Sequence, residues 1–492
     1  MPVSIDDLPD ADLRRFDRPS VPPPDALEDV YLIGICGTGM GALAGLLKQA
    51  GYDVSGADDG VYPPMSTHLA EQEIPVLEGY DPAHLDPPPD LTVVGNACTP
   101  THPEAAYARE QRLVQQSFPE ALAHCFLTEE RRPLVVTGTH GKTTTTGLLV
   151  HLLRHAGRDP GYLVGGVPQD DGGSYALGTD APFVLEGDEY DSAYFDKRPK
   201  FMHYRPRHAV VTSVEYDHAD IFADPADYRG AFESFVGLLP PDGLLALCGD
   251  EPAVRALADQ ADATVRTYGL DDANDVRADD LTATPDGQRF SLRLGGARTE
   301  ALLPMYGPHN VQNALAAALL AHREGVRRSA IVEGLASFAG MKRRQEVRGR
   351  PNDVLVLDDF AHHPTAVRTT IEAVRAAHPD RRLVAVFEPR SNSSRRKIFE
   401  ASYGEAFDRA DAAFLKAPPV RHNDDADAML DPDAVVRSIR DRGTPADAFE
   451  DVDGMLPALL DTLRPGDVAL LMSNGSFDGL HDRLLAALDP SS

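Results

Sequence analysis

Residues 138–143 read Gly-Thr-His-Gly-Lys-Thr, and their types and spacing point most directly to chemistry. The apolar run Leu134 to Val136 before them predicts a buried strand, and the periodic stretch Gly147 to Arg154 after them predicts a helix. Glycines let backbone N–H groups close around phosphate oxygens, and a helix N-terminus adds positive charge. Lys142 would then reach the outer phosphates, and the Thr143 hydroxyl would bind Mg²⁺.

This turn is the shorter Gly-x-x-Gly-Lys-Thr form of a phosphate-binding loop, and it predicts a nucleoside triphosphate site. Four consecutive threonines are poor helix formers, so a ligand role is the better explanation of their place at a helix start. The residues predicted to hold the phosphates are Gly138, Thr139, His140, Gly141, Lys142, Thr143 and Thr144.

Carboxylates follow the next two buried strands that the sequence predicts. Phe183 to Leu185 runs into Glu186-Gly-Asp-Glu-Tyr-Asp, and Ala209 to Thr212 is followed by Ser-Val-Glu-Tyr-Asp-His. Hard oxygen ligands with one histidine suit Mg²⁺, or Mn²⁺ as an alternative. We therefore expect Thr143, Glu186 and His218 to bind metal. Asp188 and Asp191 are equally well explained as solvated acidic loops.

A second glycine turn, Gly34 to Gly41, lies between the predicted strand Val30 to Ile33 and a predicted helix over 42–50. A strand over 53–56 then leads to Asp58, as in a dinucleotide-binding unit, although such a turn accepts any diphosphate, including that of a UDP-sugar. Another polar loop follows the predicted strand 91–95. The substrate-binding residues expected here are Gly37, Thr38, Gly39, Met40, Asp58, Asn96, Thr99 and His102.

Asn310 and Asn313 lie three residues apart beside a predicted Ala-rich helix over 314–322, so they share a face. They could cap that helix or hydrogen-bond an adenine edge. Further along, strands predicted over 354–357, 383–387 and 468–472 each end in a polar loop. Alternating strands and helices predict a third open α/β sheet.

The chain has 492 residues, too many for one core, and we expect about three domains. The predicted boundaries are a loosely ordered arm over 1–28, then domains over 29–128, 129–345 and 346–492. The sequence contains no apolar run of about 20 residues, and its acidic, Pro-rich start does not resemble a signal peptide. We therefore expect a cytoplasmic protein without a membrane partner.

The formal net charge is −30 at pH 7, which argues against nonspecific nucleic-acid binding. The acidic residues are spread along the chain and predict a solvated acidic surface, for which a salt-rich cytoplasm is one hypothesis. We expect a monomer or a weak dimer.

The motifs together resemble the bacterial Mur ligases, ATP-dependent enzymes of peptidoglycan metabolism that form amide bonds. The resemblance covers about residues 29 to 485. It rests on the phosphate loop, Glu186, Glu215-x-Asp217-His218, His309-Asn310-x-x-Asn313, Arg344 and Asp359-x-x-His362. It implies a three-domain α/β fold in which a Rossmann-like domain binds a UDP-sugar, a central domain binds ATP and a Rossmann-like third domain closes on them. It also implies an acyl-phosphate intermediate.

The resemblance implies roles for several residues. Lys142, Glu186 and His218 would act in catalysis, and Arg344 and Asp359 would contact ATP from the third domain. His362 or His363 would be the base that keeps the attacking amine neutral, although strand-end capping and packing explain both histidines equally well. Ser213 and His102 depart from the family, which usually carries Asn at both positions.

Within the family, the Gly34 to Gly41 turn is similar to the enzymes that accept UDP-N-acetylmuramate. Some of these add L-alanine, and others add the tripeptide L-alanyl-γ-D-glutamyl-meso-diaminopimelate during peptidoglycan recycling. Residues 61–67, 195–206, 388–392 and 473–475 are similar to the tripeptide-adding type. Arg390, Asn392 and Asn474 are then expected to hold the peptide carboxylates.

Three alternatives remain open at this point. The L-alanine-adding enzyme has the same chemistry and a smaller nucleophile. A nicotinamide-dependent oxidoreductase would use the Gly34 to Gly41 turn but leaves the Gly-Lys-Thr loop unexplained. A nucleotide-binding regulator without ligase activity would share the phosphate loop.

Overall fold

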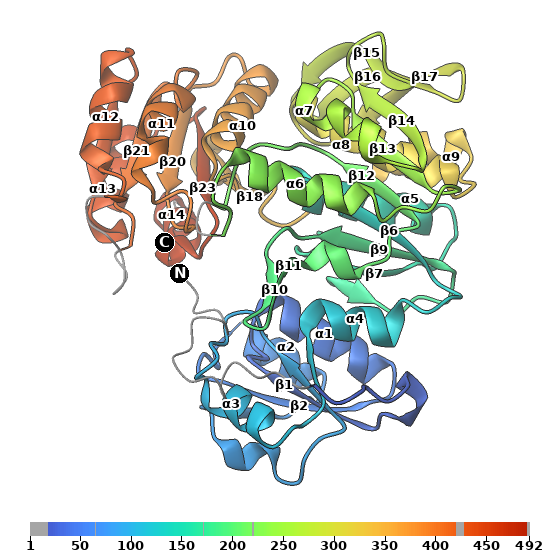
Figure 1. Cartoon of the computed structure of the whole chain (residues 1–492). Coiled ribbons are helices and arrows are strands. Elements are labelled where there is room, and N and C mark those ends of the chain that lie inside the picture. Colours follow the sequence, from blue (N-terminus) through green and yellow to red (C-terminus); the bar gives the residue numbers. More distant parts are fainter. Residues whose placement is uncertain (1–17, 64, 171, 219–220, 420–427, 490–492) are drawn as a thin grey trace.

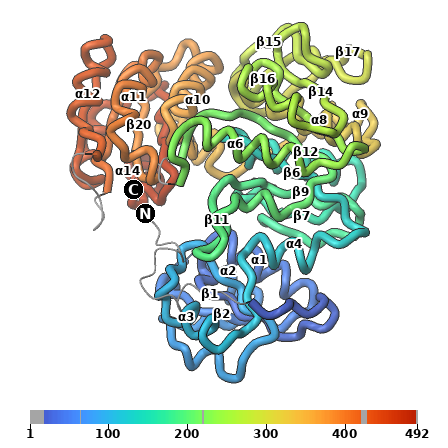
Figure 2. Tube along the Cα trace, in the orientation of Figure 1, coloured from blue at the N-terminus to red at the C-terminus, as the bar shows by residue number. Residues whose placement is uncertain are grey.

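The computed structural model describes residues 18–489 except 64, 171, 219–220 and 420–427. The chain forms three α/β units, each built on its own sheet, and they follow one another along the sequence (Figure 1). The tube in Figure 2 runs from blue through green to red without returning to an earlier unit. The predicted three-domain α/β fold is confirmed. No helix among the described residues has the length and apolar character that a membrane crossing requires.

The N-terminal unit is a five-stranded parallel sheet in the order β3-β2-β1-β4-β5. Its strands are β1 (Asp29–Ile33), β2 (Asp53–Asp58), β3 (Val76–Glu78), β4 (Leu91–Val94) and β5 (Gln115–Ser117). Its helices are α1 (Thr38–Gln49), α2 (Met65–Glu71), α3 (Pro103–Glu110) and α4 (Phe118–Phe126). The strand order reverses between β1 and β4, and in open α/β sheets ligands bind at such a switch point.

The central unit has a ten-stranded sheet in the order β17-β16-β15-β14-β13-β12-β6-β9-β7-β8. The strands are β6 (Arg132–Thr137), β7 (Gly161–Leu163), β8 (Tyr175–Ala176), β9 (Pro182–Gly187), β12 (His208–Val211), β13 (Leu244–Cys248), β14 (Thr264–Gly269), β15 (Val276–Thr284), β16 (Gly287–Leu294) and β17 (Ala297–Leu303). The helices are α5 (Lys142–His155), α6 (Pro225–Val236), α7 (Pro252–Arg255), α8 (Pro308–Arg323) and α9 (Arg328–Ser337). The strands that carry the polar loops, β6, β9 and β12, are parallel neighbours.

The C-terminal unit is a six-stranded sheet in the order β18-β19-β23-β20-β21-β22, with only β18 antiparallel. The strands are β18 (Glu346–Gly349), β19 (Leu355–Asp359), β20 (Leu383–Glu388), β21 (Ala412–Lys416), β22 (Ala446–Phe449) and β23 (Val468–Ser473). The helices are α10 (Pro364–Ala377), α11 (Glu400–Ala406), α12 (Pro432–Asp441), α13 (Val452–Thr462) and α14 (Leu480–Leu488).

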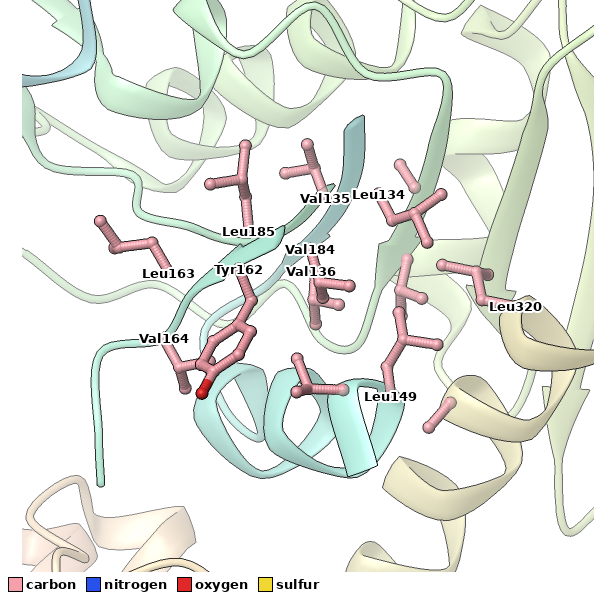
Figure 3. Close-up of a cluster of buried hydrophobic side chains, with 14 of the residues drawn as sticks. Leu134, Val135, Val136, Leu149, Tyr162, Leu163, Val164, Val184, Leu185 and Leu320 are labelled. Atoms are coloured by element: carbon pink, nitrogen blue, oxygen red, sulfur yellow. The ribbon is translucent and has the colours of Figure 1, made fainter. Parts of the chain in front are cut away.

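The core of the central unit fixes the strand that precedes the phosphate loop. Leu134 and Val136 of β6 are fully buried and pack with Val184 of β9, Leu149 of α5 and Leu320 of α8 (Figure 3). A parallel strand covered on both faces reads as a continuous apolar run, which is why this run predicts β6. Burial on both faces leaves the end of β6 little freedom to move.

A hairpin of the central unit, β10 (Asp191–Ala193) and β11 (Asp196–Pro199), reaches the N-terminal unit. The buried Tyr194 at its turn packs with Tyr31 and Ile33 of β1. The hairpin's second strand, β11, lies within the stretch 195–206, which is similar to the tripeptide-adding enzymes. Its position links the N-terminal sheet to the central one.

Two predicted helices begin earlier in the chain than expected. α5 begins at Lys142 rather than at residue 147, and α8 begins at Pro308 rather than at 314. Tertiary packing of both helices outweighs the weak helix propensity of their first turns.

Residues 1–17 lie outside the described residues. From Arg18 onward the arm contacts the N-terminal unit, since Arg18 pairs with Glu120 at 2.8 Å, so this part is not loosely ordered as predicted.

Candidate active site

The loop between β6 and α5 has the backbone geometry of a phosphate-binding turn. Gly138 (φ 133°) and Gly141 (φ 80°) both have positive φ. A Cβ on Gly138 would lie 2.2 Å from Thr212 Oγ1, and one on Gly141 would lie 2.4 Å from Asn313 Oδ1. Only glycine fits both positions without displacing a neighbour. Gly141 directly precedes α5, so the loop leads into the unpaired N–H groups of the first helical turn.

The ammonium of Lys142 is held by a carboxylate that the sequence analysis did not select. Lys142 Nζ donates to both oxygens of Glu189, at 3.0 and 2.9 Å, and to the Gly138 carbonyl at 2.6 Å. Burial alone would lower the pKa of Lys142, but the carboxylates of Glu189 and Asp188 outweigh burial and raise it. Lys142 therefore stays charged in a buried position.

His218 contacts the same carboxylate. Its Nε2 lies 3.1 Å from Glu189 Oε1, and the Glu189 side chain is fully buried. Burial alone would lower the pKa of His218, but hydrogen bonding to Glu189 and the charges of Glu189 and Asp217 raise it. Glu189 thus joins the phosphate-loop lysine to the histidine that follows β12.

Thr143 and Glu186 form an oxygen pair that fits a magnesium ion. Thr143 Oγ1 donates to Glu186 Oε1 at 2.9 Å, and the Gly165 N–H donates to the other oxygen at 2.8 Å. Adjacent ligands on an octahedral Mg²⁺ with bonds of about 2.0–2.1 Å lie about 2.9 Å apart. Burial raises the pKa of Glu186, and a bound cation would supply the missing positive charge. Of the three predicted metal ligands, Thr143 and Glu186 are in contact, whereas His218 contacts Glu189.

A cavity of about 240 Å³ lies between the central and C-terminal units, in front of the phosphate loop. It is lined by eight of the residues predicted to bind the nucleotide: His140, Gly141, Thr143, Thr144, Asn310, Asn313, Arg344 and Asp359. Gly138, Thr139 and Lys142 belong to the same loop but do not line it. The apolar wall of the cavity is formed by Cys248, Tyr268 and Met305, which carry no motif and were not predicted from the sequence.

Asn310 and Asn313 are both buried in the first turns of α8. Asn313 Nδ2 donates to Asn310 Oδ1 at 3.1 Å, and Asn310 Nδ2 donates to the Tyr306 carbonyl at 2.9 Å. The N-cap of α8 is Gly307, which makes no side-chain cap, so the capping alternative is wrong. The helix begins upstream of both asparagines, and these hydrogen bonds hold both side chains in the cavity wall.

The C-terminal unit reaches the phosphate loop through Arg344. Its Nη2 donates to Thr143 Oγ1 at 3.4 Å, and burial lowers the pKa of Arg344. Asp359 lines the cavity, but its two oxygens accept the backbone N–H groups of Gln345 (2.9 Å) and Ala361 (2.8 Å). Asp359 therefore holds the loops around Arg344 in place.

His362 and His363 stand where the C-terminal unit meets the central one. His363 caps α10, because its Nδ1 accepts the N–H of Thr365 at 3.4 Å, as the capping alternative expects. His362 Nδ1 lies 3.1 Å from the Phe360 carbonyl. Burial lowers the pKa of both rings to about 4, so both are neutral at pH 7 and are weak bases.

The residues predicted to bind the UDP-sugar gather at the carboxyl ends of β1, β2 and β4. Gly37 is the N-cap of α1, and Thr38, Gly39 and Met40 form its first turn. Asp58 accepts the N–H groups of Cys36 (2.9 Å) and Gly60 (2.8 Å), so its carboxylate shapes the glycine turn.

Asn96, Thr99 and His102 lie in and after the loop that follows β4. His102 is the N-cap of α3, with Nδ1 3.5 Å from the Ala105 N–H, and burial lowers its pKa. Its ring lies 4.1 Å from that of Tyr80, edge to face. The predicted substrate residues therefore do come together at the switch point of this sheet.

The residues expected to hold the acceptor follow β20 and β23, which are neighbouring strands. Arg390 packs against Gly475, where a Cβ would lie 2.2 Å from Arg390 Cδ. Asn474 Oδ1 is buried and has no hydrogen-bond partner among the described residues. Asn392 lies in the same loop as Arg390.

This loop touches the catalytic side of the central unit. Ser393 Oγ accepts the backbone N–H of His218 at 3.2 Å. Behind the loop, the buried Glu388 pairs with Lys416 at 2.8 Å and accepts the Ser473 hydroxyl at 2.6 Å. The loops after β20 and β23 are therefore tied to each other and to the central unit.

Comparison with known proteins agrees with this arrangement. Three family models match the chain: "Mur ligase family, catalytic domain" over 29–129, "Mur ligase middle domain" over 136–321 and "Mur ligase, glutamate ligase domain" over 343–475. The chain is 38% identical to UDP-N-acetylmuramate–L-alanyl-γ-D-glutamyl-meso-2,6-diaminoheptandioate ligase from Haemophilus influenzae, covering 94% of this chain and 99% of that protein. It is 39% identical to a UDP-N-acetylmuramate–L-alanine ligase from Kineococcus radiotolerans, covering 91% and 93%.

A solved structure supports the same assignment. The crystal structure of a murein peptide ligase from Psychrobacter arcticus matches with a TM-score of 0.71 and 35% identity, covering 94% of this chain and 99% of that one. The family matches extend over all three units and include the phosphate loop and the loops after β20 and β23. The predicted ligase class is thereby confirmed, and this chain belongs to the Mur ligase family.

Proposed function

We propose that this protein joins UDP-N-acetylmuramate to the tripeptide L-alanyl-γ-D-glutamyl-meso-diaminopimelate, with hydrolysis of ATP to ADP and phosphate. The lactyl carboxylate would be activated as an acyl phosphate, and the peptide amine would displace phosphate. We further propose that the domains divide near residues 128 and 345, and that the enzyme works in the cytoplasm with ATP as its phosphate donor.

The first step brings two anions together, so its main requirement is positive charge. Lys142 and Arg344 would face the phosphates, and the glycine turn would offer N–H groups to them. Mg²⁺ held by Thr143 and Glu186 would neutralise charge on the phosphate oxygens. Lys142 would move from Glu189 to the phosphates, while His218, whose pKa is raised by its hydrogen bond to Glu189, stays beside that carboxylate.

The second step requires a neutral amine near the activated carbonyl. His362 and His363 are neutral at pH 7, and both lie where the C-terminal unit meets the central one. Their low pKa makes them suited to orient the amine and to take its proton only as the amide bond forms. They would contact the acceptor from the side of α10.

The observation that carries the choice of acceptor is the contact between Ser393 and the backbone of His218. It supports a peptide path along the loop that contains Arg390 and Asn392. Arg390 is well suited to a peptide carboxylate because its guanidinium forms paired hydrogen bonds.

L-Alanine is the second candidate acceptor, since a relative of that activity is 39% identical to this chain. Overall identity does not separate the two activities, because the two relatives differ by one percentage point. The loops after β20 and β23 favour the tripeptide.

The test measures ADP release with ATP, Mg²⁺ and UDP-N-acetylmuramate, with either tripeptide or L-alanine as acceptor. We expect turnover with the tripeptide and little with L-alanine. Lys142→Ala serves as the inactive control enzyme. A reaction without UDP-N-acetylmuramate measures ATP hydrolysis that is not coupled to ligation. Turnover with L-alanine alone would keep the mechanism and refute the acceptor assignment.

A further inference from the structure

Three side chains from separate parts of the chain converge beside the phosphate loop, away from the Thr143–Glu186 pair. They are His140 of the loop, Glu215 after β12 and His363 at the start of α10. Each offers one ligand atom, and these atoms lie within 4.8 Å of one another. His140 Nε2 lies 2.7 Å from Glu215 Oε2, and His363 Nδ1 lies 3.8 Å from the same oxygen. Two units of the protein therefore contribute to one cluster.

We propose that His140, Glu215 and His363 form a binding site for a borderline divalent cation such as Zn²⁺, bridging the central and C-terminal units. Two imidazoles and one carboxylate are a donor set that Zn²⁺ favours and Mg²⁺ does not. Tetrahedral Zn²⁺ with bonds of about 2.0–2.1 Å places its ligand atoms about 3.3 Å apart. The 2.7 Å separation of His140 and Glu215 would therefore open, and the wider separations, all within 4.8 Å, would close. The site uses His140 and His363, which the proposed ligase mechanism also uses, so its test measures cation binding without nucleotide or acceptor.

His363 presents one ring nitrogen to the cluster. The residue is buried, with 5% of its surface exposed. Its Nδ1 faces the N–H of Thr365 and Glu215, so the proton lies on Nε2, which is buried and has no hydrogen-bond partner among the described residues. The single Nδ1 lone pair accepts the Thr365 N–H at 3.4 Å, so a bound cation would replace this long hydrogen bond.

Glu215 is held in place by hydrogen bonds to His140 and Thr365. Its Oε1 accepts the Thr365 hydroxyl at 2.7 Å, which leaves Oε2 for the two histidines. Within the described part of the chain, no lysine or arginine forms an ion pair with it. The side chains of Glu215 (41% exposed) and His140 (26% exposed) leave an entry path for an ion and room for a water ligand.

A second cluster of similar composition already has arginines paired with its carboxylates. Glu120, Asp196 and His203 also converge, but Arg18 pairs with Glu120 at 2.8 Å and Arg198 pairs with Asp196 at 2.7 Å. Guanidinium groups already neutralise both carboxylates there. His203→Asn is therefore a matched control for a histidine whose loss should not affect cation binding.

The test is calorimetric titration of the full chain with ZnCl₂ in the absence of nucleotide. His363→Asn removes the imidazole while supplying a residue that is favoured at helix N-caps. Glu215→Gln removes the charge but keeps an oxygen for Thr365. We expect both variants to bind Zn²⁺ at least about 100-fold more weakly than wild type, because even outer-shell partners of a metal are worth about 10–100-fold. His203→Asn should bind Zn²⁺ like wild type.

His218→Asn distinguishes this site from the Glu186 and Glu189 region. We expect it to keep the cation site, with unchanged affinity for the first Zn²⁺ bound. Wild-type affinity in His363→Asn and Glu215→Gln, or a loss of binding only in His218→Asn, would overturn the proposal. Circular dichroism of each variant checks that the helices are intact, and Glu215→Gln decides the matter if His363→Asn does not fold.

Discussion

The ammonium of Lys142 compensates the buried carboxylate of Glu189, so Lys142→Ala should destabilise the central unit. Two unit charges 2.9 Å apart attract by about 6 kcal/mol at an effective dielectric constant of about 20. Part of this attraction offsets the desolvation of both groups, and breaking a buried pair costs about 3–5 kcal/mol. His218 remains beside Glu189 and still donates a hydrogen bond to it, so we expect a cost at the lower end of this range, about 3 kcal/mol.

Native-state hydrogen exchange of β6 and α5 measures this cost locally, which suits a protein of several units. A loss of about 3 kcal/mol speeds exchange through global opening of the central unit by roughly 100-fold. The double variant Lys142→Ala with Glu189→Gln removes the stranded charge, so it should recover more than half of the lost stability. Lys197→Ala is the control, because its pair with Asp191 is partly exposed and worth about 1 kcal/mol or less.

Activity separates the catalytic role of Lys142 from its structural one. Both the single and the double variant should lose ATP turnover, while binding of UDP-N-acetylmuramate stays unchanged because that site lies on another sheet. Unchanged exchange in Lys142→Ala, or a double variant as unstable as the single one, would contradict the charge argument. Retained turnover would refute the assignment of the phosphate loop.

Three further predictions concern the acceptor, pH and salt. Arg390→Ala should lower kcat/KM for the tripeptide by about 10–100-fold through the loss of a charge-assisted hydrogen bond, and an unchanged value in steady-state assays would exclude Arg390 from acceptor binding. Burial and nearby arginines lower the pKa of His208 from 6.5 to about 4. The neutral form therefore contributes up to about 3 kcal/mol to the free energy of unfolding above pH 6.5, and this contribution is lost as the pH falls to about 4. His208→Asn should flatten that slope in urea titrations, and the same slope in wild type and variant would contradict this. The net charge of −30 predicts a higher Tm in molar KCl than in dilute buffer, and no dependence on KCl would argue against adaptation to salt.

The sequence predicted the elements that carry chemistry better than those that do not. The strands before the phosphate loop, before Glu186 and before His218 were all predicted, because each is a short apolar run with a polar end. The strands β13 to β17 carry no motif and were not predicted. β15 and β17 alternate more and less exposed residues on either side of the mostly buried β16, in an antiparallel arrangement. The starts of α5 and α8 were placed late because local propensity disfavours threonine and asparagine in helices, whereas packing of both helices decides the outcome.

Glu189 illustrates what local pattern does not reveal. It stands in the same acidic run as Glu186, Asp188 and Asp191, and four carboxylates in six residues look alike in sequence. In the structure each has a different partner: Glu186 contacts Thr143, Asp188 pairs with Lys200, Glu189 with Lys142 and Asp191 with Lys197. Chain direction at the end of β9 decides which carboxylate faces the phosphate loop.

By itself, the sequence determined the glycine turns, the strand–loop–helix order and the family, because these depend on residue types within a few positions of one another. Only the tertiary structure decided the contacts between distant segments. His140 meets Glu215 across 75 residues, Glu215 meets Thr365 across 150, and His218 meets Ser393 across 175. Such contacts follow from how sheets and units pack, since burial of apolar surface fixes the framework and the polar side chains at its edges are then brought together.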